Sequence, residues 1–231
     1  SVKTEFSGGL VNDFSLTVNR GANRMVNLTA NVVASGTTGS AGSAQTEPVE
    51  TQLNAATAGV WIDDTPLDVG KATAGNRSQD LDPSTSDCVS PTDITTGIRA
   101  ITWNFSNGVN PDDNFRVGGG LVMSVGERGG RVQTLVLDFD YGDDTYITGL
   151  KNQTEYVFQM IVRGGESTTD SGYYHGFNLI FPVIQLENLE VVDDNGQLVN
   201  RMTFKVFDDD SASNHGSVYF DVFNEEAAYM A

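Results

Sequence analysis

The sequence predicts an all-β fold: an antiparallel β-sandwich or barrel with one short flanking helix and long loops. Two observations lead to this prediction. Apolar and polar residues alternate one by one along several segments, which is the period of a strand with one buried face. Turn-forming residues separate these segments, and the Asn195-Gly196 pair is the clearest example. Sheets of this kind are typically antiparallel and fold into sandwiches or barrels.

The first two strands are predicted to form a hairpin around a turn at residues 21–23. In the first strand, Phe14, Leu16 and Val18 alternate with Asp13, Ser15, Thr17 and Asn19. In the second strand, Val26, Leu28, Ala30 and Val32 alternate with Asn27, Thr29 and Asn31. One face of this hairpin is therefore expected to be apolar and the other polar.

The same alternation continues through the rest of the chain. It occurs in four further sets: Ile101, Trp103 and Phe105; Leu135, Leu137, Phe139 and Tyr141; Tyr156, Phe158, Met160 and Val162; and Met202, Phe204 and Val206. Another strand is predicted at residues 121–125, between glycines. A short helix is predicted between Asp143 and Lys151, because an aspartate can cap its first turn, and a second one at residues 224–231.

The segment Gly176–Asp210 has the clearest strand and turn pattern of the chain. It is predicted to form a strand, a break at Pro182, a second strand, a tight turn at Asn195-Gly196 and a last strand that ends in three aspartates. Proline cannot donate a hydrogen bond to a neighbouring strand, and Asn-Gly suits a two-residue turn. We therefore predict that one sheet gives way to the next at Pro182.

The chain is predicted to form a single domain over residues 1–231, with long loops at about 35–57 and 70–97. The stretch Ser35–Gln45 is built from Gly, Ser, Thr and Ala, can bury almost nothing, and is expected to be a flexible loop. The stretch Gly70–Thr96 is polar and contains two prolines. Long loops are unusual in a compact β domain and usually serve a function.

The charge balance argues against a surface that grips nucleic acid. The 31 acidic residues outnumber the 13 basic ones, giving a net charge of −18, and phosphate binding needs clustered Lys and Arg. Most of the acids are aspartates, and lysine is scarce. This composition is typical of halophilic proteins, because high salt screens self-repulsion; an ordinary acidic protein kept soluble by its charge is the alternative. No apolar run approaches the roughly 20 residues of a membrane span.

We predict no catalytic, cofactor-binding or metal-ligating residue. Cys88 is the single cysteine, so no intramolecular disulfide can form, and His175 and His215 each lie in a Gly-containing turn without further ligands. The carboxylates gather in two clusters: Asp138, Asp140, Asp143 and Asp144, and Asp208, Asp209 and Asp210. Neither cluster has the spacing of a calcium loop, so we interpret both as solvated strand ends, with cation binding as the alternative.

Other signatures of chemistry are absent or weak. The glycines at 118–120, 126, 129 and 130 do not form a dinucleotide-binding fingerprint, and no G-x-S-x-G elbow occurs. A pair of strand carboxylates facing each other across a cleft, as in a glycosidase, stays open. The N-x-S/T triplets at Asn27, Asn76, Asn104 and Asn152 permit glycosylation without indicating it.

Four segments in order make a recognisable arrangement. They are the opening hairpin NDFSLTVNRGANRMVNLTANVV, the strand IRAITWNFSNGV, the unit RVQTLVLDFDYGDDTYITGLKNQTEYVFQMIVRG and the segment Gly176–Asp210. This arrangement resembles the tail tube protein, or major tail protein, of siphovirus-type tailed viruses. The resemblance is one of arrangement, since this family has no short diagnostic motif.

The resemblance implies a structural virion protein rather than an enzyme. Such proteins form rings, commonly hexameric, whose sheets join around a channel, and the rings stack into the tail tube through which the genome is ejected. Partners would be other copies of the chain and the tail proteins at the tube ends, with DNA passing through without specific binding. The protein would be assembled in the host cytoplasm, without a membrane, and located in the tail. A halophilic composition would indicate a haloarchaeal virus.

The residues are compatible with this expectation. Open strand edges are stabilised by pairing with neighbouring copies, and an acidic channel would repel DNA phosphates. We expect rings to form through strand edges. The loops Ser35–Gln45 and Gly70–Thr96 are the candidates for contacts between stacked rings.

Three other functions remain open. A carbohydrate-binding β-sandwich module would expose aromatic side chains on one face, and the candidates are Trp61, Trp103, Tyr173 and Tyr174. Trp103 falls on the apolar face of its strand, which favours core packing for it. A β-sandwich hydrolase would use two strand carboxylates. A capsid decoration protein, or another virion surface protein, would share the structural class of a tube protein and differ in what it assembles on.

Overall fold

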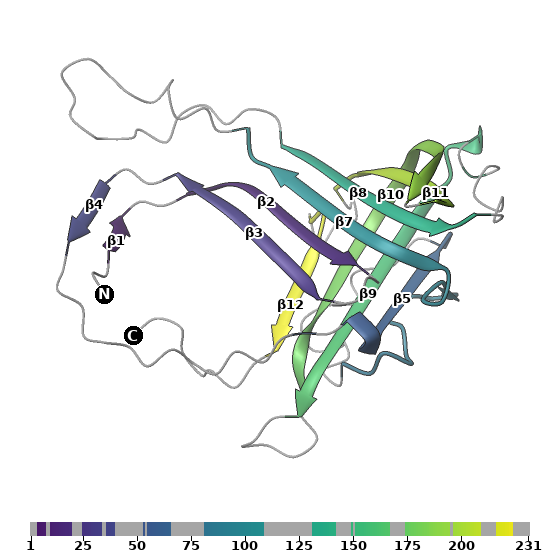
Figure 1. Cartoon of the computed structure of the whole chain (residues 1–231), viewed down its shortest axis with the longest axis horizontal. Coiled ribbons are helices and arrows are strands. Elements are labelled where there is room, and N and C mark those ends of the chain that lie inside the picture. Colours follow the sequence, from purple (N-terminus) through teal and green to yellow (C-terminus); the bar gives the residue numbers. More distant parts are fainter. Residues whose placement is uncertain are drawn as a thin grey trace. The chain divides into compact units, whose positions relative to one another are not determined.

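The all-β prediction is confirmed in a computed structural model of the chain. It describes residues 4–7, 10–19, 25–33, 36–39, 53, 55–65, 81–108, 131–141, 149, 151–166, 174–194, 196–208 and 216–223. The elements are β1 (Thr4–Ser7), β2 (Leu10–Asn19), β3 (Val26–Val33), β4 (Gly36–Gly39), η1 (Ala55–Thr57), β5 (Ala58–Asp63), β6 (Thr92–Asp93), β7 (Ile98–Ser106), β8 (Val132–Asp140), β9 (Glu155–Glu166), β10 (Tyr174–Asp194), β11 (Gln197–Val206) and β12 (Tyr219–Phe223). Figure 1 shows them as arrows coloured along the sequence.

The described strands form one large open sheet and one small one. The large sheet has ten strands in the order β3-β2-β7-β8-β11-β10-β9-β5-β6, and β12 pairs with β10 off this path. Strands β1 and β4 form the separate two-stranded sheet. The predicted antiparallel all-β class is therefore confirmed, and among the described strands the large sheet is single and not closed, so it is not a complete barrel.

The chain divides into two compact units. One comprises Ser1–Leu16, Asn27–Glu50 and Trp103–Thr134, and the other comprises Thr17–Val26, Thr51–Thr102 and Leu135–Ala231. Strands β2, β3, β7 and β8 have residues in both units. The division therefore does not decide the prediction of a single domain.

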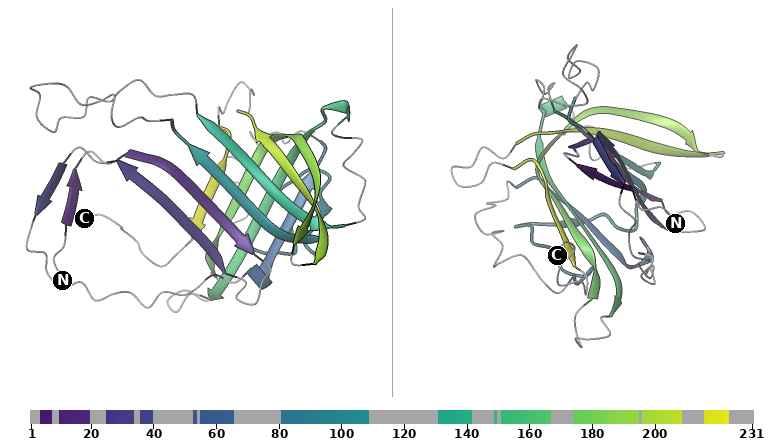
Figure 2. Two further views of the ribbon diagram at one scale, coloured as in Figure 1. Left: turned by 45° about the horizontal axis from the view of Figure 1, so that its top comes forward. Right: turned by 90° about the vertical axis from the view of Figure 1, so that its left-hand side faces the viewer.

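Strand β10 is continuous through Pro182, so the predicted break at this residue is wrong. The strand pairs with β9 through residues 174–185, with an irregularity between Phe181 and Ile184. On its other edge, β12 pairs up to Ile180 and β11 begins at Ile184. Pro182 thus lies in the gap between two partner strands, where its missing N–H removes no ladder bond. The later half of β10 and β11 form a hairpin that curves away from the earlier half (Figure 2, right, light green).

The turn of this hairpin agrees with the sequence prediction. Asp194 pairs with Gln197, which leaves a two-residue connection. Gly196 has a φ of 83°, as a type I′ turn requires, and its N–H donates to the Asp193 carboxylate at 2.7 Å. Asn195 lies outside the described residues.

Most of the predicted apolar faces are buried. Leu16, Ile101, Leu135, Leu137 and Phe204 are at most 2% exposed. Tyr141, which was grouped with the buried face of β8, is instead 59% exposed, because β8 ends one residue before it. The polar side of β3 is exposed as predicted, at Asn27, Thr29 and Asn31, but Leu28 and Ala30 of its apolar side are exposed as well.

Strands β9 and β10 are buried on both faces, which the alternating pattern did not predict. Residues 157–162 and 176–182 are buried without interruption. One face carries Phe158, Met160 and Leu179, and the segment of residues 81–91 packs against the other. Leu81 contacts Trp61 and Ile161 there, while Cys88 forms a separate cluster with Val157 and Ile180.

Two glycines allow the 81–91 segment to approach the sheet closely. A methyl group on Gly59 would overlap the carbonyl oxygen of Pro83. A methyl group on Gly176 would overlap the carbonyl oxygen of Val162 and lie 2.9 Å from the Leu81 side chain. The described part of the predicted loop 70–97 is therefore packed on β5, β9 and β10 and contains β6, rather than extending as a free loop.

The remaining expectations about loops and helices have mixed outcomes. The prediction of a flexible loop at Ser35–Gln45 is wrong for residues 36–39, because these residues form β4 and pair with β1. Of the predicted helix at 143–151, only residues 149 and 151 are described, and both have a helical backbone. The predicted strand at 121–125, the turn at 21–23 and the helix at 224–231 lie outside the described residues.

Candidate functional site

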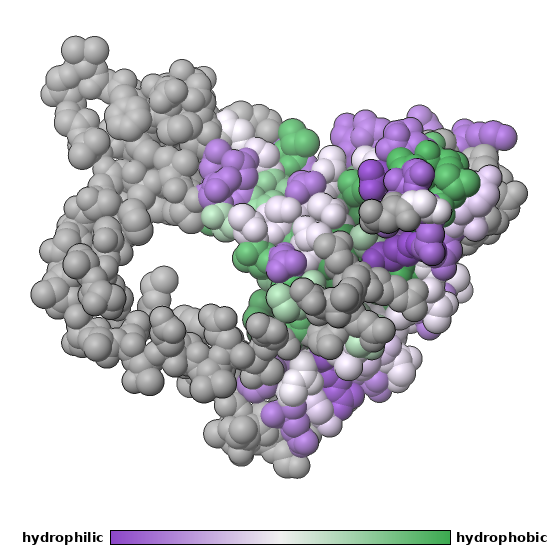
Figure 3. Space-filling view, viewed as in Figure 1, coloured by the Kyte–Doolittle hydropathy of each residue, from purple (hydrophilic) through white to green (hydrophobic). Residues whose placement is uncertain are grey.

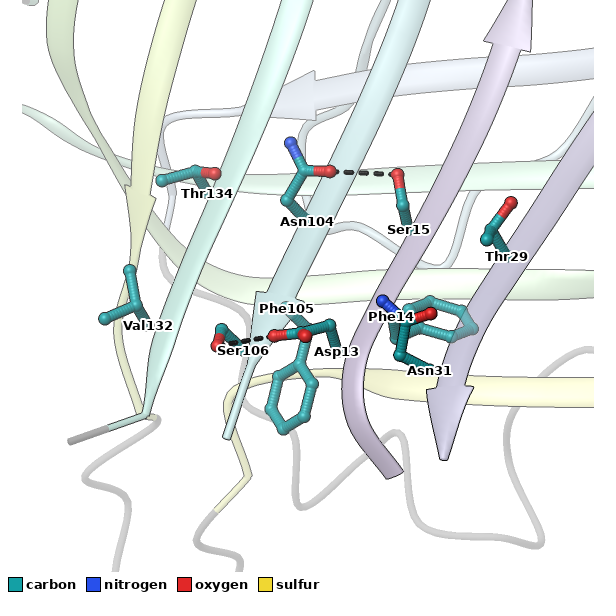
Figure 4. Close-up of a pocket in the computed structure, with 10 residues that line it drawn as sticks. All are labelled: Asp13, Phe14, Ser15, Thr29, Asn31, Asn104, Phe105, Ser106, Val132 and Thr134. Atoms are coloured by element: carbon teal, nitrogen blue, oxygen red, sulfur yellow. Dashed lines mark hydrogen bonds between the residues drawn. The ribbon is translucent and has the colours of Figure 1, made fainter. Parts of the chain in front are cut away.

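A hollow of about 250 Å³ lies on β3, β2, β7 and β8, and polar and apolar residues both line it. Its lining residues are Asp13, Phe14, Ser15, Thr29, Asn31, Asn104, Phe105, Ser106, Val132 and Thr134. Figure 4 shows that the hydroxyl of Ser15 donates to the Asn104 side chain at 2.9 Å, and that of Ser106 donates to Asp13 at 2.7 Å. Alternation creates this surface, because every second residue of these strands is polar.

The hollow has hydrogen-bonding groups without an activated nucleophile. The Ser15 hydroxyl donates its hydrogen bond to the oxygen of an amide, which cannot act as a base. The Ser106 hydroxyl donates directly to the Asp13 carboxylate, without a histidine between them. Its one carboxylate, on Asp13, also accepts a hydrogen bond from the Asn12 amide at 3.1 Å. These groups suit contact with water or a polar surface rather than a reaction.

Two arginines link the adjacent strands β7, β8 and β11 of the large sheet. Arg201 on β11 donates two parallel hydrogen bonds to Asp138 on β8, at 2.8 and 2.9 Å, and these bonds raise the pKa of Arg201. Arg99 on β7 contacts both Asp140 and Gln197. Asp138 is therefore not a solvated strand end as predicted, because its carboxylate is held by a bidentate ion pair.

A buried polar network holds the 81–91 segment on the sheet. Gln159 on β9 is fully buried, and its Oε1 accepts hydrogen bonds from the Ser86 hydroxyl and the Asp87 N–H, both at 2.8 Å. Its Nε2 donates to the Asp87 carboxylate at 2.8 Å and to Asn178 at 3.0 Å. We call Gln159, Asn178, Ser86 and Asp87 the Gln159 network. Sequence reasoning missed it, because nothing local marks a glutamine in a strand as buried.

A second contact fixes the far end of the same segment. Asp63 at the end of β5 is 2% exposed, and its carboxylate accepts hydrogen bonds from the N–H groups of Ser90 at 2.7 Å and Thr65 at 2.8 Å. These two donors satisfy a carboxylate that would otherwise be costly to bury. The Gln159 network and Asp63 therefore both hold the 81–91 segment on the sheet.

Cys88 is buried within this segment. Burial raises the pKa of its thiol to about 11, although the Ser86 hydroxyl acts in the opposite direction. The thiolate is the reactive form of cysteine, so this thiol is unreactive near neutral pH.

The other residues singled out from sequence are scattered. His175 lies near the start of β10 rather than in a turn, and His215, Asp143, Asp144, Asp209 and Asp210 lie outside the described residues. Asp208 is exposed after β11. Among the described residues, no three His, Cys, Asp or Glu side chains gather in a way that could hold a metal ion. No helix in the described part is long and apolar enough to cross a membrane.

The two tryptophans proposed for sugar contact are buried, and Tyr174 is half-buried. Trp61 and Trp103 are each 5% exposed, and Phe14 packs against Trp103 with ring centroids 4.8 Å apart. The guanidinium of Arg163 covers the ring of Tyr174 at 3.3 Å. Tyr173 lies outside the described residues.

No family model matches the chain, and no curated protein matches it. The choice among the candidate functions therefore depends on the strands and surfaces of the large sheet.

Proposed function

We propose that the protein is a structural protein that assembles with copies of itself through the edges of its sheet, as a tail tube protein of a siphovirus-type virus does. The copies would form rings, and the rings would stack into a tube that serves as the channel for genome ejection. One observation carries the proposal: among the described strands the large sheet is open, with β3 at one end of its strand order and β6 at the other. Unpaired edges are templates for pairing with another chain.

The polar face of the sheet supports a role as a wall. The hollow on β3, β2, β7 and β8 has hydroxyls, amides and one carboxylate beside the apolar side chains of Phe14, Phe105 and Val132, with no cationic side chain among its lining residues. A surface of this kind retains water and offers DNA phosphates no ion pair. Together with the net charge of −18, it suits a channel through which nucleic acid slides without binding.

The long loops keep their proposed role in stacking, with one restriction. Residues 81–91 are engaged with their own sheet through the Gln159 network and Asp63. A contact between rings by the Gly70–Thr96 stretch would therefore involve residues before 81, which lie outside the described residues, as do Ser35 and residues 40–45 of the other loop.

Electron microscopy of the purified protein tests the proposal. We expect rings or stacked tubes. Their abundance should rise with KCl concentration, because copies of charge −18 repel one another and salt screens that repulsion. A protein that stays monomeric at every salt and protein concentration would rule out self-assembly. Binding to a shell of another virion protein without self-assembly would instead indicate a decoration protein.

A further inference from the structure

We draw no further inference here: the strongest candidate, the apolar surface patch on the β10–β11 hairpin (Figure 3), where Val191 and Leu198 are exposed, carries none because nothing in the described part of the chain shows what covers this patch.

Discussion

The Gln159 network should be necessary for holding the 81–91 segment on the sheet. Replacing Gln159 with leucine keeps a similar volume and removes the hydrogen bonds that its side chain makes with Ser86, Asp87, Cys88 and Asn178. The Asp87 N–H and the Asn178 side-chain oxygen then lose partners in an interior where Asn178 is 1% exposed. An unsatisfied buried group costs about 1–3 kcal/mol, so the expected loss of unfolding free energy is about 2–5 kcal/mol.

Two measurements check this expectation. Urea denaturation gives the loss of unfolding free energy. Cleavage by an aspartate-specific protease at Asp82 or Asp87 reports local opening of the segment. A loss of 2 kcal/mol or more should raise the opened fraction by about 30-fold. Gln185→Leu is the control, because Gln185 lies partly exposed on β10 and its side chain donates a hydrogen bond to the Gln153 carbonyl at 2.7 Å.

A double variant tests whether the loss of stability comes from polar groups left without partners. Replacing both Gln159 and Asn178 with leucine removes both amides, leaves fewer unmatched groups, and should cost less than the sum of the two single changes. If Gln159→Leu is as stable as Gln185→Leu and cleavage at Asp87 does not change, the Gln159 network is not what holds the segment. In that case apolar contacts alone would hold the segment.

Three further changes have defined outcomes. The raised pKa of Cys88 means that its contribution to stability is present below about pH 9 and lost between pH 9 and about 11, so urea midpoints of wild type should fall more steeply over this range than those of Cys88→Ala. Asp138→Asn breaks the bidentate pair with Arg201 and should lower the free energy of unfolding by about 1–2 kcal/mol in urea denaturation. An unchanged free energy would mean that the pair does not stabilise the fold. Gly59→Ala should lower the thermal midpoint and release the 81–91 segment to proteolysis, because the methyl group overlaps Pro83; an unchanged midpoint would mean that the segment shifts without cost.

Alternation along single strands was sufficient to predict the all-β class. The apolar sets that include Leu16, Ile101 and Phe204 are buried, and the Asn195-Gly196 turn connects adjacent strands as expected. These features depend on residues two apart in sequence, so a local pattern contains the information. The prediction failed at Pro182, because proline is tolerated where neither partner strand needs its N–H, and that depends on where β11 and β12 begin and end.

The polar contacts could not have been predicted from the sequence. Gln159 and its partner Asp87 are 72 residues apart, and Arg201 and Asp138 are 63 apart. In the sequence, each of these four residues is an ordinary polar residue of an alternating strand or of a polar loop. Burial of the second face of β9 follows from the same long-range fold, since the 81–91 segment covers it. Sequence patterns alone therefore underestimated the core.

The mass of the wild-type protein in solution tests self-assembly most directly. Light scattering after gel filtration, across a range of protein and KCl concentrations, should give multiples of the single-chain mass of 24.8 kDa that increase with both variables. A constant mass of one chain under all conditions would contradict the account.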